Sequence, residues 1–233
     1  TGFSIESSFG ENGAPGFARW LQGIESSVVQ FGSGDIVAES FTVCSVTRWT
    51  TSDPVDDGQT QARIIQGSVN LIQGQVASLK NPGDPVIASV GVAYYGDAWL
   101  TPNDARMRAP NAVANNITDW VVMCTAGGAS PGSGLRIANF VDVSIANSGL
   151  GNAELWINPG GANPLGSTGW AISELVIWDR GLSETDIWDA ATAVYQSALC
   201  DSAPPPSPLP ALLQSLKEKY DAIIEDVKNC QIN

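Results

Sequence analysis

Residues 169–187, GWAISELVIWDRGLSETDI, contain a strand pattern that runs directly into a helix start. From Trp170 to Trp178 every residue is apolar or β-branched except Ser173 and Glu174. A strand that lacks a polar face is typical of a position inside a sheet whose two faces are both covered. We therefore expect this strand to lie inside such a sheet.

The residues after this strand predict a short turn at 179–181 and then a helix. Ser183 is a favourable helix N-cap, and Asp186 follows it by three residues, as in a capping box. Leu182 and Ile187 occupy the two positions of a hydrophobic staple. We expect a helix from Ser183 to about Leu199, the only helix inside the domain.

This series of strand, Asp-Arg-Gly turn, Leu-Ser and acidic helix start resembles the closing segment of laminin-G-like and concanavalin A-like lectin/glucanase domains. Three more stretches look like the algal and protist branch of that family and fall in the expected order: residues 41–49, residues 91–95 followed by Trp99, and residues 119–124. The resemblance spans roughly residues 15–198 and implies an all-β, antiparallel jelly roll. Jelly rolls serve as lectins, adhesins and hydrolases, so the resemblance alone selects no function.

The spacing of apolar runs also predicts a β-sandwich. Short runs rich in Val, Ile, Thr and aromatic residues alternate with Gly, Pro, Asp and Asn. Residues 1–14 are expected to be an arm or an edge strand, which pairs either with its own sheet or with that of a neighbour. The jelly roll is expected over residues 15–199, with strands at 27–31, 40–50, 61–65, 71–76, 86–95, 119–125, 135–145, 153–158 and 170–178.

A proline-rich spacer is expected over residues 200–210. Consecutive prolines favour extended polyproline II, which makes a semi-rigid spacer. The segment also resembles the hydroxyproline-rich motifs of algal and plant extracellular glycoproteins; a plain linker is the alternative. The resemblance implies hydroxylation and O-glycosylation at Pro204, Pro205, Pro206 and Pro208.

An amphipathic helix is expected over residues 211–233. Its apolar residues recur at spacings of three and four, which is a heptad pattern. An isolated helix of this length is marginal in water, so the apolar seam needs a cover. A second copy, another protein and the jelly roll itself are the candidates. The seam consists of Leu213, Leu216, Tyr220, Ile223 and Val227.

The four cysteines fit neither a zinc spacing nor a Cys-x-x-Cys redox motif. Two disulfides are one interpretation; the alternative is that Cys44 and Cys124, which lie within apolar strands, are reduced core thiols. For Cys200 and Cys230, which flank the proline-rich segment, we favour a disulfide. A bond from Cys230 to another chain would instead make the seam an assembly contact.

The composition narrows the class of protein. In 233 residues, 11 basic side chains face 24 acidic ones, and the net charge of −13 argues against nucleic acid and anionic membranes as partners. No apolar run reaches the ~18 residues of a membrane span. Because the chain opens at Thr1, we expect a secreted protein whose leader has been removed, although a trimmed chain would look identical.

Catalytic patterns are missing from the sequence, and we expect a protein that is not an enzyme. The chain has no histidine, the commonest general base. The carboxylates Glu174 and Asp179 lack the spacing that glycoside hydrolysis requires. No cofactor is expected except calcium, for which Asp53, Asp56 and Asp57 offer oxygen ligands in a turn, if this is not simply a solvated acidic turn.

Two tryptophans and one sequon are the remaining candidate sites. Trp99 and Trp156 flank loops and would suit stacking on a sugar ring if exposed. Asn116 begins an N-glycosylation sequon. We expect a non-enzymatic extracellular structural or adhesive glycoprotein that self-associates or binds another extracellular protein in a surface layer, appendage or filament. The alternative is a carbohydrate-binding lectin, with or without calcium.

Overall fold

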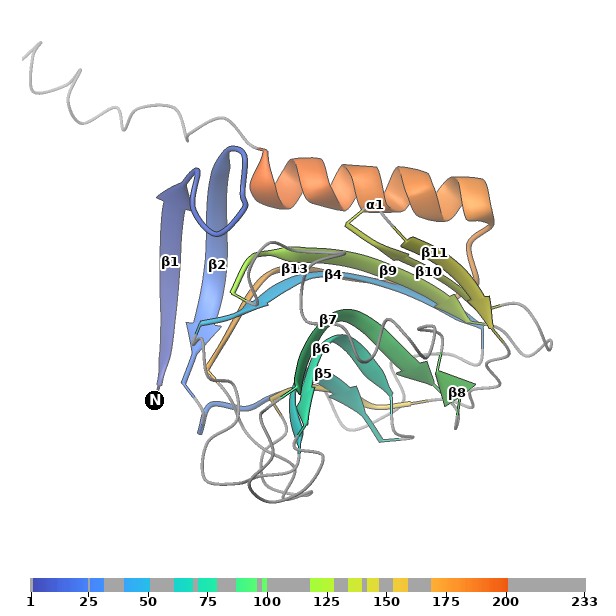
Figure 1. Ribbon diagram of the computed structural model, residues 1–233, viewed down its shortest axis with the longest axis horizontal. Helices are drawn as coiled ribbons and strands as arrows, with labels where there is room; N and C mark the ends of the chain where they lie inside the picture. Colours follow the sequence, from blue (N-terminus) through green and yellow to red (C-terminus); the bar gives the residue numbers. More distant parts are fainter. Residues whose placement is uncertain are drawn as a thin grey trace, which may run out of the picture. The chain divides into compact units, whose positions relative to one another are not determined.

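The computed structural model describes residues 2–24, 26–31, 40–50, 61–68, 71–78, 87–95, 98–99, 118–127, 134–139, 142–146, 153–158 and 169–200. These residues form two antiparallel sheets and one helix, arranged as a jelly-roll sandwich (Figure 1). The predicted fold class is therefore confirmed. The predicted helix at 211–233 and all but the first residue of the predicted spacer lie outside the described residues.

One sheet has seven strands and contains the stretch from Trp170 to Trp178. All its neighbouring strands are antiparallel. In spatial order the strands are β1 (Phe3–Phe9), β2 (Phe17–Gly23), β13 (Trp170–Trp178), β4 (Phe41–Trp49), β9 (Val121–Gly127), β10 (Gly134–Ala138) and β11 (Asp142–Ala146).

The other sheet has six strands and faces the first across the core. Figure 1 shows its central strands stacked against β4 and β9. In spatial order its strands are β3 (Val29–Gln30), β12 (Leu155–Ile157), β5 (Gln61–Gly67), β6 (Ile72–Ser78), β7 (Ile87–Tyr95) and β8 (Ala98–Trp99).

β13 lies inside its sheet, between β2 and β4, and both its faces are covered. A bulge at Ser173 shifts its register against β4 and reverses the alternation of its side chains. Before the bulge, Trp170 and Ile172 contact the core between the sheets; after it, Leu175 and Ile177 do so. The bulge thus keeps one apolar face along the whole strand despite the polar pair in its middle. The side chains that face the helix are Ala171, Val176 and Trp178.

The helix, α1 (Glu184–Leu199), covers the outer face of the seven-stranded sheet (Figure 1). The Asp186 amide donates to the Ser183 hydroxyl oxygen at 3.2 Å, and that hydroxyl donates to the Asp186 carboxylate at 2.7 Å. Ile187 is fully buried, and Leu182 packs in the same cluster. The predicted helix bounds, N-cap and hydrophobic staple are therefore confirmed. No helix in the described ranges has the length and apolar character needed to cross a membrane.

The structure corrects three strand predictions. The run predicted at 135–145 is a hairpin of β10 and β11, with Asn139 at its turn in the left-handed region, φ 42°. β9 continues through Gly127, two residues beyond the expected strand end at 125. Glycine is required at this position because the Phe41 ring lies where a Cβ would be. β2 was missed, since residues 17–23 have apolar residues on both faces and no clean alternation.

The N-terminal strand pairs with its own sheet. β1 and β2 form a hairpin in unbroken register from Phe3 opposite Gly23 to Phe9 opposite Phe17. β1 is the last strand on this side of the sheet, and among the described residues no strand pairs with its other edge.

Candidate functional site

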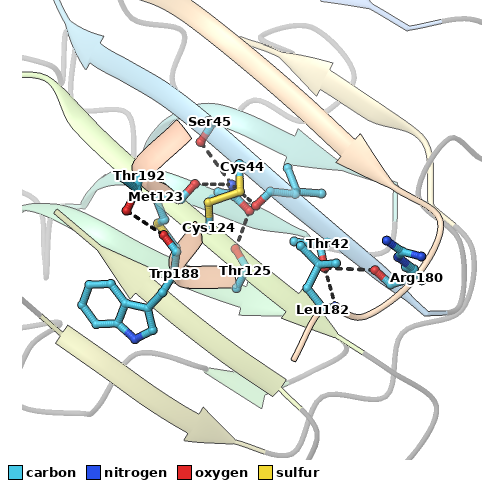
Figure 2. The surroundings of a disulfide bond; sticks show 12 residues. Thr42, Cys44, Ser45, Met123, Cys124, Thr125, Arg180, Leu182, Trp188 and Thr192 are labelled. Carbon is cyan, nitrogen blue, oxygen red and sulfur yellow. Dashed lines mark hydrogen bonds between the residues drawn. A yellow bond between two sulfur atoms is a disulfide. The ribbon is translucent and has the colours of Figure 1, made fainter. Parts of the chain in front are cut away.

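A disulfide joins the centres of β4 and β9. Cys44 and Cys124 are directly opposite each other in the antiparallel register, fully buried beneath α1 (Figure 2). The disulfide interpretation is therefore confirmed for these two residues, and the alternative of reduced core thiols is wrong. The bond closes a segment of 80 residues, which on the chain-entropy model stabilises the fold by about 4 kcal/mol.

Beside the disulfide, Thr42 fixes the turn that leads into the helix. Its hydroxyl donates to the Arg180 carbonyl oxygen at 2.9 Å and accepts from the Leu182 amide at 2.9 Å (Figure 2). One side chain on β4 therefore positions the start of α1, so the closing segment is attached to the sheet by hydrogen bonds as well as by packing.

Two glutamines on β6 connect the sheets through the core. The Gln73 amide nitrogen donates to the carbonyl oxygens of Val43 and Met123 and to the Ser45 hydroxyl, at 3.0–3.3 Å. Its amide oxygen accepts from Thr125. The Gln75 amide oxygen accepts from the Thr47 hydroxyl, and its amide nitrogen donates to the Thr47 carbonyl. These buried amides have their partners, so their role is structural.

A buried arginine lies between two tryptophans on the outer face of the seven-stranded sheet. The Arg48 guanidinium carbon is 5.3 Å from the Trp20 ring centroid and 5.2 Å from that of Trp120. Burial lowers the pKa of Arg48, and the nearby carboxylates of Glu11 and Asp119 raise it. The cation thus lies between two ring faces, which stabilise its charge.

Reactive groups do not converge in the described residues. Within those ranges no three His, Cys, Asp or Glu side chains gather closely enough to hold a metal ion. Glu174 lies on β13 and Asp179 in the exposed turn after it. Two surfaces formed by the described residues are candidates for binding.

The first surface is the outer face of the six-stranded sheet. Trp156 lies between Leu155 and Ile157, whose side chains enter the core, so its own side chain lies on the opposite face. Trp156 is half-buried. Successive cross-strand partners make a transverse row that crosses all six strands: Gln30, Trp156, Gln66, Ile72, Tyr94 and Trp99.

The transverse row places the two predicted tryptophans in one line, four strand spacings apart. That separation is about 19 Å between backbone positions along the row. The middle of the row is buried, with Gln66 5% and Ile72 2% exposed. Arg63 lies nearby on β5. Burial lowers the pKa of Arg63, and its electrostatic interaction with Tyr94 raises that pKa.

The second surface is formed by apolar residues near the N-terminus, which we call the N-terminal apolar surface. Every large hydrophobic side chain that is exposed in the described residues belongs to it. β1 and β2 extend beyond β5, β6 and β7 (Figure 1), so these three strands do not cover this end of the first sheet. Its members are Phe3, Ile5, Phe9, Ile24 and Val28, from 41% to 69% exposed.

This surface continues the core that lies between the sheets. Phe3 packs edge-on against Trp170, a buried member of that core. Ile5 is opposite Leu21 in the β1–β2 register, and Leu21 packs against the same core. Next to the start of β1, the Ile24 amide donates to the Gly2 carbonyl. The apolar face of the sheet therefore extends into solvent at β1.

This surface was not predicted as a site, although residues 1–14 were expected to be an arm or an edge strand. The signal was the alternation of Phe3, Ile5 and Phe9 with serines and Glu6 in a strand at the chain's start. What the sequence did not reveal is that β5, β6 and β7 stop short of this strand (Figure 1).

Several predicted sites lie outside the described residues and stay predictions: Asp53, Asp56 and Asp57, the sequon at Asn116, the four prolines and the residues of the C-terminal seam. Cys200 carries a free thiol in the structure. Its predicted partner Cys230 also lies outside the described residues, so that bond stays a prediction too.

Comparisons with known proteins give likenesses of fold at low identity. No family model matches the chain, and no curated protein sequence matches it. A native heptameric SAP-like pentraxin from Limulus polyphemus is similar at 13% identity and a TM-score of 0.44, over 88% of this chain and 85% of that one. Domain 4 of a GH43 extracellular arabinanase from Geobacillus stearothermophilus, in complex with arabinotriose, is similar at 12% identity and a TM-score of 0.45, over 81% of each chain.

A third likeness, to a sialidase from Trypanosoma rangeli, has 13% identity and a TM-score of 0.41 and covers 84% of this chain but 32% of that one. At these identities and TM-scores the likenesses transfer no function to this chain.

Proposed function

We propose that this protein is a non-enzymatic, extracellular structural or adhesive component that self-associates or binds another extracellular protein through its N-terminal apolar surface. The observation that carries the proposal is the concentration of exposed large hydrophobic side chains between Phe3 and Val28. Large hydrophobic side chains that are exposed close together on a globular protein often mark a binding site.

The buried disulfide between Cys44 and Cys124 supports the extracellular location. Structural disulfides persist in oxidising compartments and are rare in the cytosol. The net charge of −13 supports a protein partner over nucleic acid or an anionic membrane. Glycosylation at Asn116 and at the four prolines belongs to the same proposal, and intact-mass measurement on native material tests it.

Sedimentation velocity across a concentration series tests the proposal. We expect the full chain to show a rise in weight-average mass with concentration, and Ile5→Ser with Phe9→Ser to reduce it. The matched control is Ala193→Ser with Gln196→Ser, which changes two exposed residues of α1. A chain that stays monomeric throughout and also binds no protein of its native extracellular matrix would refute the proposal.

The C-terminal seam is proposed as a second contact. Leu216→Ser with Ile223→Ser in the full chain would weaken association further if the seam joins copies. Equal association with and without these changes, at the same ionic strength, would show that the seam has no part in assembly.

A second candidate function is glycan binding, which the transverse row favours because it places a half-buried Trp156 between Gln30 and Gln66. An aromatic ring flanked by amides is typical of sites that bind sugars. A glycan array run with and without a calcium chelator tests this function and the calcium site proposed at Asp53, Asp56 and Asp57. Trp156→Ala would abolish binding, whereas Trp188→Ala, on the opposite side of the sandwich, would not.

A further inference from the structure

We propose that two copies of this chain join edge to edge, pairing β1 with β1 antiparallel about a two-fold axis at Ser7. The inference rests on the proposed function, because it names the partner of the N-terminal apolar surface as a second copy. The pairing would merge two seven-stranded sheets into one continuous sheet.

The free edge of β1 lacks the features that usually protect an edge strand. Proteins block such edges with Pro, Lys, bulges or very short strands. β1 has seven residues, no Pro, no Lys and no register shift against β2. Its one charged residue is Glu6. Since no strand of the described residues pairs with this edge, its amides and carbonyls are available to another strand.

Symmetry limits the registers in which β1 can pair with a copy of itself. A two-fold axis perpendicular to an antiparallel pair must pass where a residue is opposite its own copy. An axis at Glu6 sets two carboxylates opposite each other, which is destabilising. An axis at Ile5 places Phe3 opposite Ser7 and leaves Phe9 opposite the first residue of the chain.

An axis at Ser7 neither pairs two carboxylates nor leaves Phe9 opposite the first residue of the chain. It places Ile5 opposite Phe9 of the second copy, twice by symmetry, and Glu6 opposite Ser8. Ile5 and Phe9 are the two most exposed large hydrophobic residues in the described part of the chain, at 69% and 67%. This register therefore pairs the side chains that gain most from burial, since aromatic and β-branched pairs stabilise a sheet.

The faces of the two sheets also match. A two-fold axis perpendicular to the sheet keeps each apolar face on the same side, so the two N-terminal apolar surfaces become one. A contact limited to one seven-residue strand is expected to be small, and small interfaces are typical of weak, reversible association. Because an isologous contact closes on itself, β1 pairing alone yields a dimer and no polymer.

The net charge of the chain predicts how dimerisation depends on salt. Each copy has a net charge of −13, whereas the strand in the contact has one charged residue. Repulsion between the two bodies is screened by salt, while the apolar contact is not weakened by it. Dimerisation should therefore strengthen as the salt concentration rises.

Disulfide trapping of Ser7→Cys in the full chain tests the register. Ser7 is exposed and would be about 5 Å from its copy between Cα atoms, within reach of a disulfide. The matched control is Ser4→Cys, an exposed serine of the same strand that would be about 20 Å from its copy. Peptide mapping by mass spectrometry identifies which position is cross-linked.

We expect Ser7→Cys to form a dimer bridged at position 7 with at least tenfold higher yield than Ser4→Cys, and with more at high salt. Equal yields for the two variants, or a higher yield for Glu6→Cys, would overturn the axis at Ser7. If the chain associates and Ile5→Ser with Phe9→Ser prevents this, yet position 7 does not cross-link, self-pairing is wrong and the proposed function stands. A chain that neither associates nor cross-links overturns self-pairing and self-association together.

Discussion

The Phe3 ring meets the Trp170 indole edge-on, with ring centroids 6.0 Å apart and planes inclined at 67°. Trp170 is fully buried at the start of β13 and donates from its indole nitrogen to the Ser27 carbonyl. One end of the exposed strand is therefore anchored to the core, while Ile5 and Phe9 lie further along it, in solvent.

This difference predicts separate roles for two phenylalanines on one strand. Phe3→Ala removes an aromatic pair worth about 1 kcal/mol in addition to its burial, so urea unfolding should show a loss of about 1–2 kcal/mol. Phe9→Ala, which truncates a side chain 67% exposed, should change stability by less than about 0.5 kcal/mol and weaken association instead. Equal stability losses for the two variants would contradict the assignment.

Removing the disulfide should cost stability without changing the fold. Cys44→Ala with Cys124→Ala releases the constraint on the 80-residue segment and should lower the free energy of unfolding by about 2–5 kcal/mol. The matched comparison is Ala193→Ser, at an exposed position of α1. An Ala193→Ser loss as large as that of the double variant would contradict this account.

Gln73 should be among the costliest residues of the core to replace. Gln73→Leu keeps the approximate volume but leaves the Ser45 and Thr125 hydroxyls without this partner, and we expect a loss of about 2–4 kcal/mol. Gln30→Leu, on the exposed edge strand β3, is the control and should change stability by less than about 0.5 kcal/mol. A stabilised Gln73→Leu variant would mean that the network adds nothing to hydrophobic packing.

Stability should fall in alkaline solution partly through Tyr195. Burial raises the pKa of Tyr195, and a hydrogen bond with the Cys200 thiol raises it further. The unfolded state then loses its proton at about pH 10 while the folded state keeps it, so stability is full below pH 10 and falls as the pH rises through the folded pKa. Tyr195→Phe should remove this part of the loss in urea titrations from pH 8 to 11.

The sequence predicted most elements because their signals are local. Ser183, Asp186 and the staple residues define the start of α1 within six residues, and the apolar run of β13 requires only its own composition. Similar reasoning applies to β4 and β7, whose expected bounds differ from the observed ones by one residue at most.

What the sequence did not predict depends on contacts between distant segments. Gln73 and Gln75 look like polar interruptions in an apolar run, and only the facing backbone of β4 and β9 explains them. The bulge at Ser173 likewise depends on register with β4. The exposure of Ile5 and Phe9 follows from where β5, β6 and β7 end (Figure 1), which no pattern within residues 1–14 records.

Hydrogen–deuterium exchange of β1 at low and high protein concentration tests the central claim most directly. If the free edge of this strand is the contact, the amides of residues 3–9 that point away from β2 should exchange at least several-fold more slowly once the chain associates. The amides bonded to β2 and those of α1 should change little. Rapid exchange along the free edge of β1 at every concentration, in a chain that nevertheless associates, would contradict the account.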